Sequence, residues 1–157
     1  MIRRRSVLAA VLALPLALGC DSKSDPKPPS AHGHRAPHGG ALVELGQEFG
    51  HVEVVLDPVS GTLTGYMLDG EAEGPVRLEE KSLALGITCG PSSFTLRMDA
   101  VGNPLTGETP GNSSQFQGQS DRLKGQKEFE AVLESVVFRG RPFSKIAFGY
   151  PRGHEGP

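Results

Sequence analysis

Four histidines and one glutamate are the side chains of this chain best suited to bind a metal ion. His32, His34 and His38 follow one another closely in a polar leader, and His51 and Glu53 alternate within a short apolar pattern. Imidazole nitrogens combined with a carboxylate suit Zn or Cu(II). The sequence therefore predicts Cu or Zn as cofactor, with His32, His34, His38, His51 and Glu53 as candidate ligands. The alternative is that the leader histidines are incidental and that His51 and Glu53 face water from a strand.

The sequence carries none of the motifs that usually mark a catalytic site. It has no G-x-S-x-G turn, no H-E-x-x-H, no C-x-x-C and no phosphate-binding glycine loop before a helix. Adjacent acidic residues such as Glu79 and Glu80 lie in apparent loops, where solvation is the default interpretation. We therefore predict that the protein is not an enzyme.

His38, His51 and Glu53 belong to a segment, residues 37–57, that has the pattern of a β-hairpin. Leu42, Val43 and Leu45 form one short apolar run, and Val52, Val54 and Leu56 form a second with period two; glycines bound the turn between them. His51 and Glu53 then share the face of the second strand opposite the valines. His38 and Glu44 could approach that face from the neighbouring strand.

The rest of the chain repeats short extended segments separated by glycine-rich turns. Strands are expected at 62–68, 76–78, 83–87, 94–98, 129–138 and 143–148, with a loop at 102–114, a short segment around Phe116 and one helical turn at 120–124. This spacing predicts an all-β fold, an antiparallel β-sandwich of Ig-like or cupredoxin-like type. The predicted domain covers residues 38–150, and residues 151–157 are expected to be a disordered tail.

Residues 1–19 look like the signal peptide of a bacterial lipoprotein, with Cys20 as the lipidated residue. Arg3, Arg4 and Arg5 precede an apolar run that is too short to cross a bilayer as a helix. The alternative is an ordinary secretory signal with a chance cysteine. Residues 20–37 are expected to be a lipidated anchor and a Pro/His-rich tether. The predicted location is the bacterial cell envelope, lipid-anchored to a membrane and facing the periplasm or the exterior.

Charge and cysteine content restrict the partners further. Cleavage after Gly19 would remove three arginines and change the formal charge from −2 to −5, which provides no basic surface for nucleic acid. Cys89 would then be the only cysteine not lipidated. It is either a small buried residue or a soft-metal thiolate ligand, which would need a histidine nearby.

The hairpin also resembles the start of a family of small bacterial lipoproteins and secreted domains with a His-rich leader. The resemblance rests on P-H-G-G (37–40), H-x-E (51–53) and Y-x-L-D-G (66–70), with S-S-Q-F (113–116) and R-G-R-P-F-S-K-I-A-F (139–148) later in the chain. A similar P-H-G-G segment occurs near the front of some heavy-metal efflux adaptor proteins. The resemblance thus implies metal handling and an envelope or efflux partner.

Two functions are therefore expected from the sequence. The first is a membrane-anchored, non-enzymatic domain that binds or passes on a transition metal. The second is a metal-free structural or interaction module whose strand edge pairs with an envelope protein by strand addition.

Overall fold

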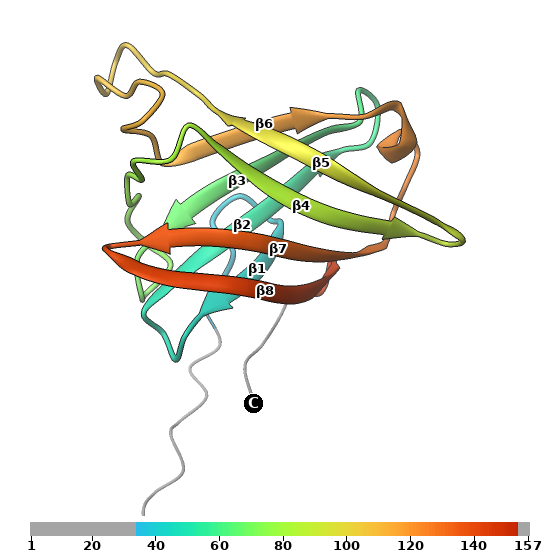
Figure 1. The fold of residues 1–157 in the computed structure, drawn as a ribbon, viewed down its shortest axis with the longest axis horizontal. Coiled ribbons are helices and arrows are strands. Elements are labelled where there is room, and N and C mark those ends of the chain that lie inside the picture. Colours follow the sequence, from blue (N-terminus) through green and yellow to red (C-terminus); the bar gives the residue numbers. More distant parts are fainter. Residues whose placement is uncertain (1–33, 154–157) are drawn as a thin grey trace, which may run out of the picture. The chain divides into compact units, whose positions relative to one another are not determined.

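The computed structural model describes residues 34–153, and this part of the chain is built from antiparallel strands with one short 3₁₀ helix and no α-helix (Figure 1). The strands are β1 (Ala41–Leu45), β2 (Gly50–Asp57), β3 (Thr62–Leu68), β4 (Ser82–Cys89), β5 (Ser92–Ala100), β6 (Gln115–Gln119), β7 (Phe129–Phe138) and β8 (Arg141–Tyr150), and η1 is Asp121–Leu123. The predicted all-β antiparallel fold is confirmed.

All eight strands belong to one sheet, in the order β1-β2-β3-β6-β5-β4-β7-β8. The outermost strands, β1 and β8, lie close to each other, so the sheet is nearly closed and its two halves face each other across a single core (Figure 1). Strands β4, β5 and β6 follow one another, and β7 returns beside β4 after a longer connection. This is a Greek-key arrangement.

The strand positions follow the apolar alternation in the sequence, with two differences. The expected strand at 76–78 is absent, because Leu78 makes only an isolated bridge to Ser113. The short segment around Phe116 is a full strand, β6, paired with β3 and β5. At the C-terminus, Gly153 donates to the carbonyl of Gly149, so hydrogen-bonded structure continues three residues past the predicted domain boundary.

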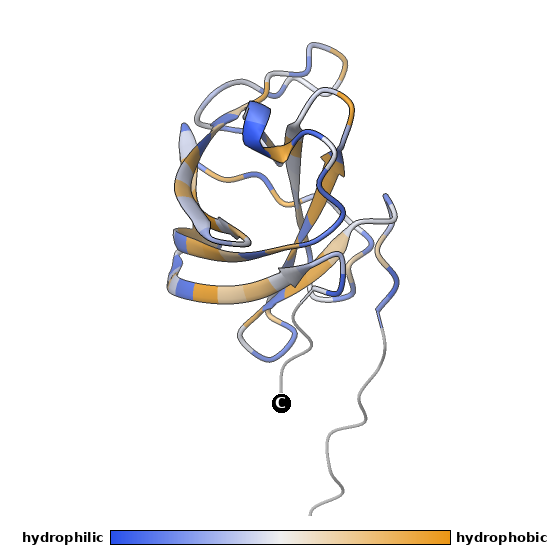
Figure 2. Cartoon of the chain, turned by 90° about the vertical axis from the view of Figure 1, so that its right-hand side faces the viewer, coloured by the Kyte–Doolittle hydropathy of each residue, from blue (hydrophilic) through white to orange (hydrophobic). Residues whose placement is uncertain are grey.

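The core forms from one face of each strand. In β1, β4 and the first half of β7, every second side chain is buried, and hydrophobic residues alternate with polar ones along the curved strands (Figure 2). The largest fully buried apolar side chains are Phe116, Phe138, Leu45, Leu63, Met67, Ile87, Met98 and Leu123. β2 is the exception, because nearly all of its residues are buried on both faces.

A kink in the β7–β8 hairpin changes which side chains face the core. In β7 every second residue is buried up to Leu133, and the alternation resumes at Val136. The set of residues that point to the core therefore shifts by one position along the strand. Glu134 and Lys145 are missing from the ladder between the two strands, Lys145 has a φ of 56°, and the two side chains form an ion pair. The kink lets Phe138 point inward at the closed end of the hairpin.

Aromatic rings close the sheet beyond this kink. Phe49, in the β1–β2 turn, lies 6.0 Å from Phe138 and 5.9 Å from Phe143, measured between ring centroids. The Arg141 guanidinium lies over both Phe49 and Phe143. The two hairpin ends therefore pack against each other where the two edge strands lie close together.

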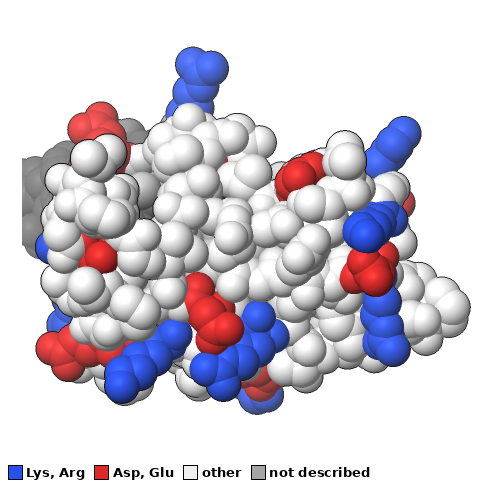
Figure 3. Space-filling view, turned by 90° about the horizontal axis from the view of Figure 1, so that it is seen from above, with Lys and Arg blue, Asp and Glu red and all other residues white. Residues whose placement is uncertain are grey.

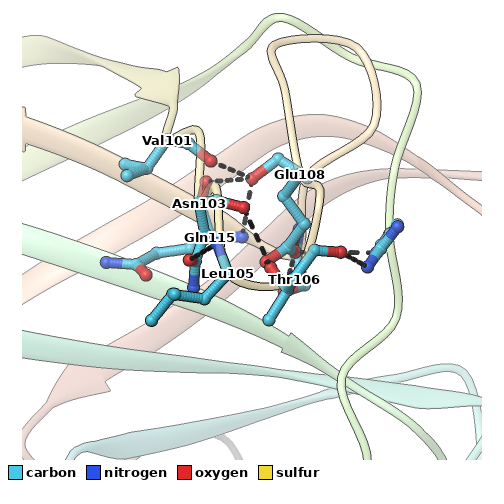
Figure 4. Close-up of polar contacts among 9 residues, drawn as sticks. Val101, Asn103, Leu105, Thr106, Glu108 and Gln115 are labelled. Atoms are coloured by element: carbon cyan, nitrogen blue, oxygen red, sulfur yellow. Dashed lines mark hydrogen bonds and ion pairs between the residues drawn. The ribbon is translucent and has the colours of Figure 1, made fainter.

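The long loop between β5 and β6 is ordered around the carboxylate of Glu108 (Figure 4). Its oxygens accept from the Ser114 amide and hydroxyl at 2.8 and 2.6 Å and from the Thr106 hydroxyl at 2.6 Å, and Arg77 lies 3.9 Å away. Burial raises the pKa of Glu108, but these hydrogen bonds and the arginine charge outweigh it and leave the pKa below its ordinary value. Glu108 therefore stabilises the fold in its ionised form.

The surface is mixed in charge where Figure 3 shows it, with acidic and basic side chains interspersed. No segment within residues 34–153 forms an apolar helix long enough to cross a membrane.

Replacing Glu108 with glutamine should destabilise the protein most at neutral pH. Because the folded-state pKa is lowered, the carboxylate contributes its full stability above the ordinary glutamate pKa of 4.5 and loses that contribution as the pH falls through the folded-state pKa. Thermal unfolding of Glu108→Gln and wild type, followed by circular dichroism between pH 7 and pH 2.5, should show two melting temperatures that converge on acidification. The exposed Glu128→Gln variant is the control and should track wild type. A constant gap for Glu108→Gln at all pH values would contradict the prediction.

Candidate functional site

The candidate site lies where the end of the leader crosses the outer face of β2. His51 and Glu53 are on the face opposite Val52 and Val54, as the alternation predicts, yet they are only 2% and 0% exposed. The alternative in which both face water is therefore wrong. The leader residues immediately before β1 account for the difference, because they contact both side chains.

Glu53 holds this leader segment through its carboxylate. One oxygen accepts from the backbone amides of His38 and Gly40 at 2.8 and 2.9 Å, and the other lies 2.7 Å from His38 Nδ1. The His38 ring stacks on Tyr66, the cross-strand neighbour of Glu53, at 3.8 Å and 8°. A buried carboxylate is tolerated when hydrogen bonds satisfy it, and residues 38–40 supply all three of these. We call this set of contacts the Glu53 latch.

Both glycines after His38 are required by this geometry. Gly39 has a φ of 74°, a left-handed conformation that side chains disfavour. A Cβ on Gly40 would lie 2.3 Å from the carbonyl oxygen of Val54. The P-H-G-G segment is thus a close approach of the leader backbone to β2, directed onto Glu53.

A second set of contacts joins His34 to His51, with ring centroids 4.9 Å apart and planes tilted by 59°. His51 Nδ1 lies 3.0 Å from the backbone carbonyl oxygen of Asp69. Because a carbonyl only accepts, Nδ1 carries the hydrogen and a neutral His51 keeps its lone pair on Nε2. A metal-ligating histidine commonly has this arrangement, with its other ring nitrogen donating to a carbonyl.

His34 is the less satisfied member of this pair. Its side chain is 14% exposed, and its Nε2 is buried without a hydrogen-bond partner. An oxygen of the Glu48 carboxylate lies 3.5 Å from Nε2, within reach of an ion pair if His34 is protonated. The Asp69 carboxylate is occupied elsewhere: the amides of Glu73 and Gly74 donate to it and lower its pKa.

The predicted ligands thus separate into two groups. His34 lies beside His51, and His38 pairs with Glu53, whereas His32 lies outside the described residues. The expected approach of His38 to the strand face ends at Glu53, and the ring beside His51 is that of His34. Within residues 34–153, no three His, Cys, Asp or Glu side chains come together as a metal-binding group.

Sequence reasoning missed Glu48 and Tyr66 as neighbours of the histidines. Tyr66 could have been found from strand register, since it lies opposite Glu53. Cys89 is partly buried at the end of β4, and burial raises the pKa of its thiol, which makes the thiolate less available.

Comparisons of the chain with protein-family models, curated proteins and solved structures found no match. The geometry of these side chains is therefore the basis for assigning a function.

Replacing Glu53 with glutamine should weaken the latch. Glutamine presents a neutral amide in place of the carboxylate. The hydrogen bonds from the His38 and Gly40 amides then lose their charge assistance, and His38 Nδ1 keeps a bond to the side chain only by changing tautomer. The expected cost is about 1–3 kcal/mol in the free energy of unfolding. Urea denaturation measures this loss, and hydrogen exchange should show faster exchange of the His38 and Gly40 amides. The exposed Glu130→Gln variant should change stability by less than about 0.5 kcal/mol. Equal effects of the two substitutions would contradict the latch.

Proposed function

We propose that the protein is a membrane-anchored, extracytoplasmic and non-enzymatic lipoprotein that binds a transition metal ion, Cu(II) or Zn(II), through His34 and His51. The observation that carries the proposal is the hydrogen bond from His51 Nδ1 to the Asp69 carbonyl beside the ring of His34. It fixes the tautomer and the orientation of His51 and leaves Nε2 as a ligand atom.

The burial of the pair supports this assignment. An imidazole nitrogen without a partner is costly inside a protein, and His34 Nε2 is buried in that state. A metal ion bound to His34 would satisfy it. The Glu48 carboxylate, 3.5 Å from His34 Nε2, would offset part of the positive charge of the ion.

The Glu53 latch has a positioning role in this proposal. It fixes residues 38–40 on β2, and His34 lies only four residues earlier in the chain. His38 and Glu53, expected from the sequence as ligands, already bond to each other. They are better suited to holding the leader than to binding the ion.

The anchoring part of the proposal depends on the N-terminal sequence. The signal-like residues 1–19 and Cys20 support lipid attachment, and a lipidated chain would keep the metal site close to the membrane surface. An envelope protein or an efflux component is the corresponding partner. A metal-free interaction module remains the second candidate, favoured by an open groove between β4 and β7.

Calorimetric titration of the purified protein with Cu(II) and Zn(II) at neutral pH tests the metal proposal. Binding in the micromolar range or tighter is expected for wild type. His34→Ala should weaken it at least tenfold, and His34→Ala/His51→Ala should abolish it, because each substitution removes one ligand. His154→Ala, which removes a histidine from the other end of the chain, is the matched control and should bind like wild type.

The other outcomes of this titration are equally informative. Binding that survives in the double variant would place the site elsewhere and contradict the role of His34 and His51. No heat of binding in wild type would exclude the metal function. Circular dichroism should accompany each titration, since His51 is buried. His34 lies on the leader and is less buried than His51, so the His34→Ala variant tests the site with less risk to the fold than a change at His51.

Replacing Cys20 with alanine should abolish lipid attachment. The thioether to the lipid needs the cysteine sulfur, so the variant should incorporate no labelled palmitate and should leave the membrane fraction when cells are fractionated. Cys89→Ala, which removes the other cysteine, should keep the label. Label in the Cys20→Ala variant would contradict the assignment.

A further inference from the structure

The ladder between β4 and β7 stops halfway along both strands. Pairing runs from Thr88–Glu130 to Leu85–Leu133 and then ends, although β4 begins at Ser82 and β7 continues to Phe138. Figure 1 shows the two strands close together at one end and spread apart at the other. Both strands keep their outer partners over this stretch, β5 for β4 and β8 for β7. The sheet therefore has a gap between two of its inner strands, β4 and β7.

An open groove of about 550 Å³ occupies this gap. Leu83, Val136 and Phe143 provide apolar lining, and Ser82, Ser135 and Arg97 provide polar lining. An extended backbone with alternating side chains matches such a mixture, because successive residues of a strand point to opposite faces.

In this groove a side-chain oxygen takes the place of a backbone carbonyl of a neighbouring strand. One oxygen of the Glu80 carboxylate accepts from the backbone amide of Val137 at 2.6 Å. In a continuous ladder, a carbonyl oxygen of the neighbouring strand would accept from an amide in this position. The Val137 amide therefore points toward β4 without a backbone carbonyl to accept its hydrogen bond. The Glu80 side chain takes the place of that carbonyl, and a side chain can be displaced.

We propose that the groove between β4 and β7 binds an extended peptide segment of a partner protein as an inserted strand. The peptide would pair with β4 at residues 82–84 and with β7 at residues 134–138, displacing Glu80 from Val137. Since β4 and β7 are antiparallel, the inserted strand is antiparallel to one and parallel to the other. Main-chain hydrogen bonds provide affinity and the apolar lining selects side chains.

The fold argues for a partner other than the chain itself. A second copy has no isolated outer edge to offer, because its β1 and β8 lie beside each other. Residues 21–33 of the leader contain Pro26, Pro28 and Pro29, which lack the amide hydrogen that a ladder requires. This inference does not depend on the proposed metal function.

Selection of a random heptapeptide library displayed on phage against the purified protein provides the probe. Enriched peptides, made synthetically with a fluorophore, should bind with micromolar affinity. N-methylation at alternate residues should weaken binding at least tenfold, because it removes ladder donors without changing side chains. Glu80→Ala should bind severalfold more tightly, since it frees the Val137 amide, whereas the neighbouring Glu79→Ala should bind like wild type. Bound peptide should slow hydrogen exchange at Val137.

Several results would overturn the proposal. They are the absence of any enriched peptide, binding indifferent to both N-methylation and Glu80→Ala, and exchange protection confined to another part of the sheet. A synthetic peptide of residues 21–33 that competes as strongly as the selected peptides would make the leader the occupant. Saturable self-association blocked by the selected peptides would make a second copy the occupant.

Discussion

The buried carboxylate of Glu53 is the interaction on which the candidate site depends. A charge taken out of water is tolerated only where hydrogen bonds replace its hydration, and the donors to Glu53 come from His38 and Gly40. The carboxylate therefore requires the leader to lie against β2, which buries the outer face of that strand. His34 reaches His51 because the leader is held in this way.

The same contacts give a physical reason for the sequence motifs. Within P-H-G-G, the histidine and second glycine bond to Glu53, the glutamate of H-x-E; the Y-x-L-D-G segment contributes the ring that stacks on His38 and the carbonyl that orients His51. Separate motifs thus meet at one structural contact. The presence of these motifs in a sequence therefore indicates this contact between leader and sheet, and does not by itself indicate a metal site. The metal proposal depends on the histidine pair beside it, of which His51 alone belongs to a motif.

How far the sequence predicted the structure can be seen from particular residues. Regular apolar alternation located β1 to β5, β7 and β8, whereas β6 was missed as a strand because Phe116 is its single large apolar residue. The period-two alternation placed His51 and Glu53 on one face of the strand but implied that this face contacts water. The segment that covers them lacks large apolar residues, so hydrophobicity could not reveal it. The apolar residues of β7 and β8 are spaced by three at the kink, from Leu133 to Val136 and from Phe143 to Ile146. This break in the two-residue period is visible in the sequence, although it was not interpreted as a kink.

The closure of the sheet explains why a groove remains inside it. Complete burial of a ring such as that of Phe138 stabilises the fold by about 1.5–3 kcal/mol. A ladder hydrogen bond contributes only about 0.5–1.5 kcal/mol net, and water or Glu80 can replace part of it. Turning Phe138 and Phe143 toward Phe49 therefore outweighs the few β4–β7 bonds left unmade. The unpaired backbone of β4 and β7 follows from closing the sheet with aromatic rings, and it is this backbone that an inserted strand could pair with.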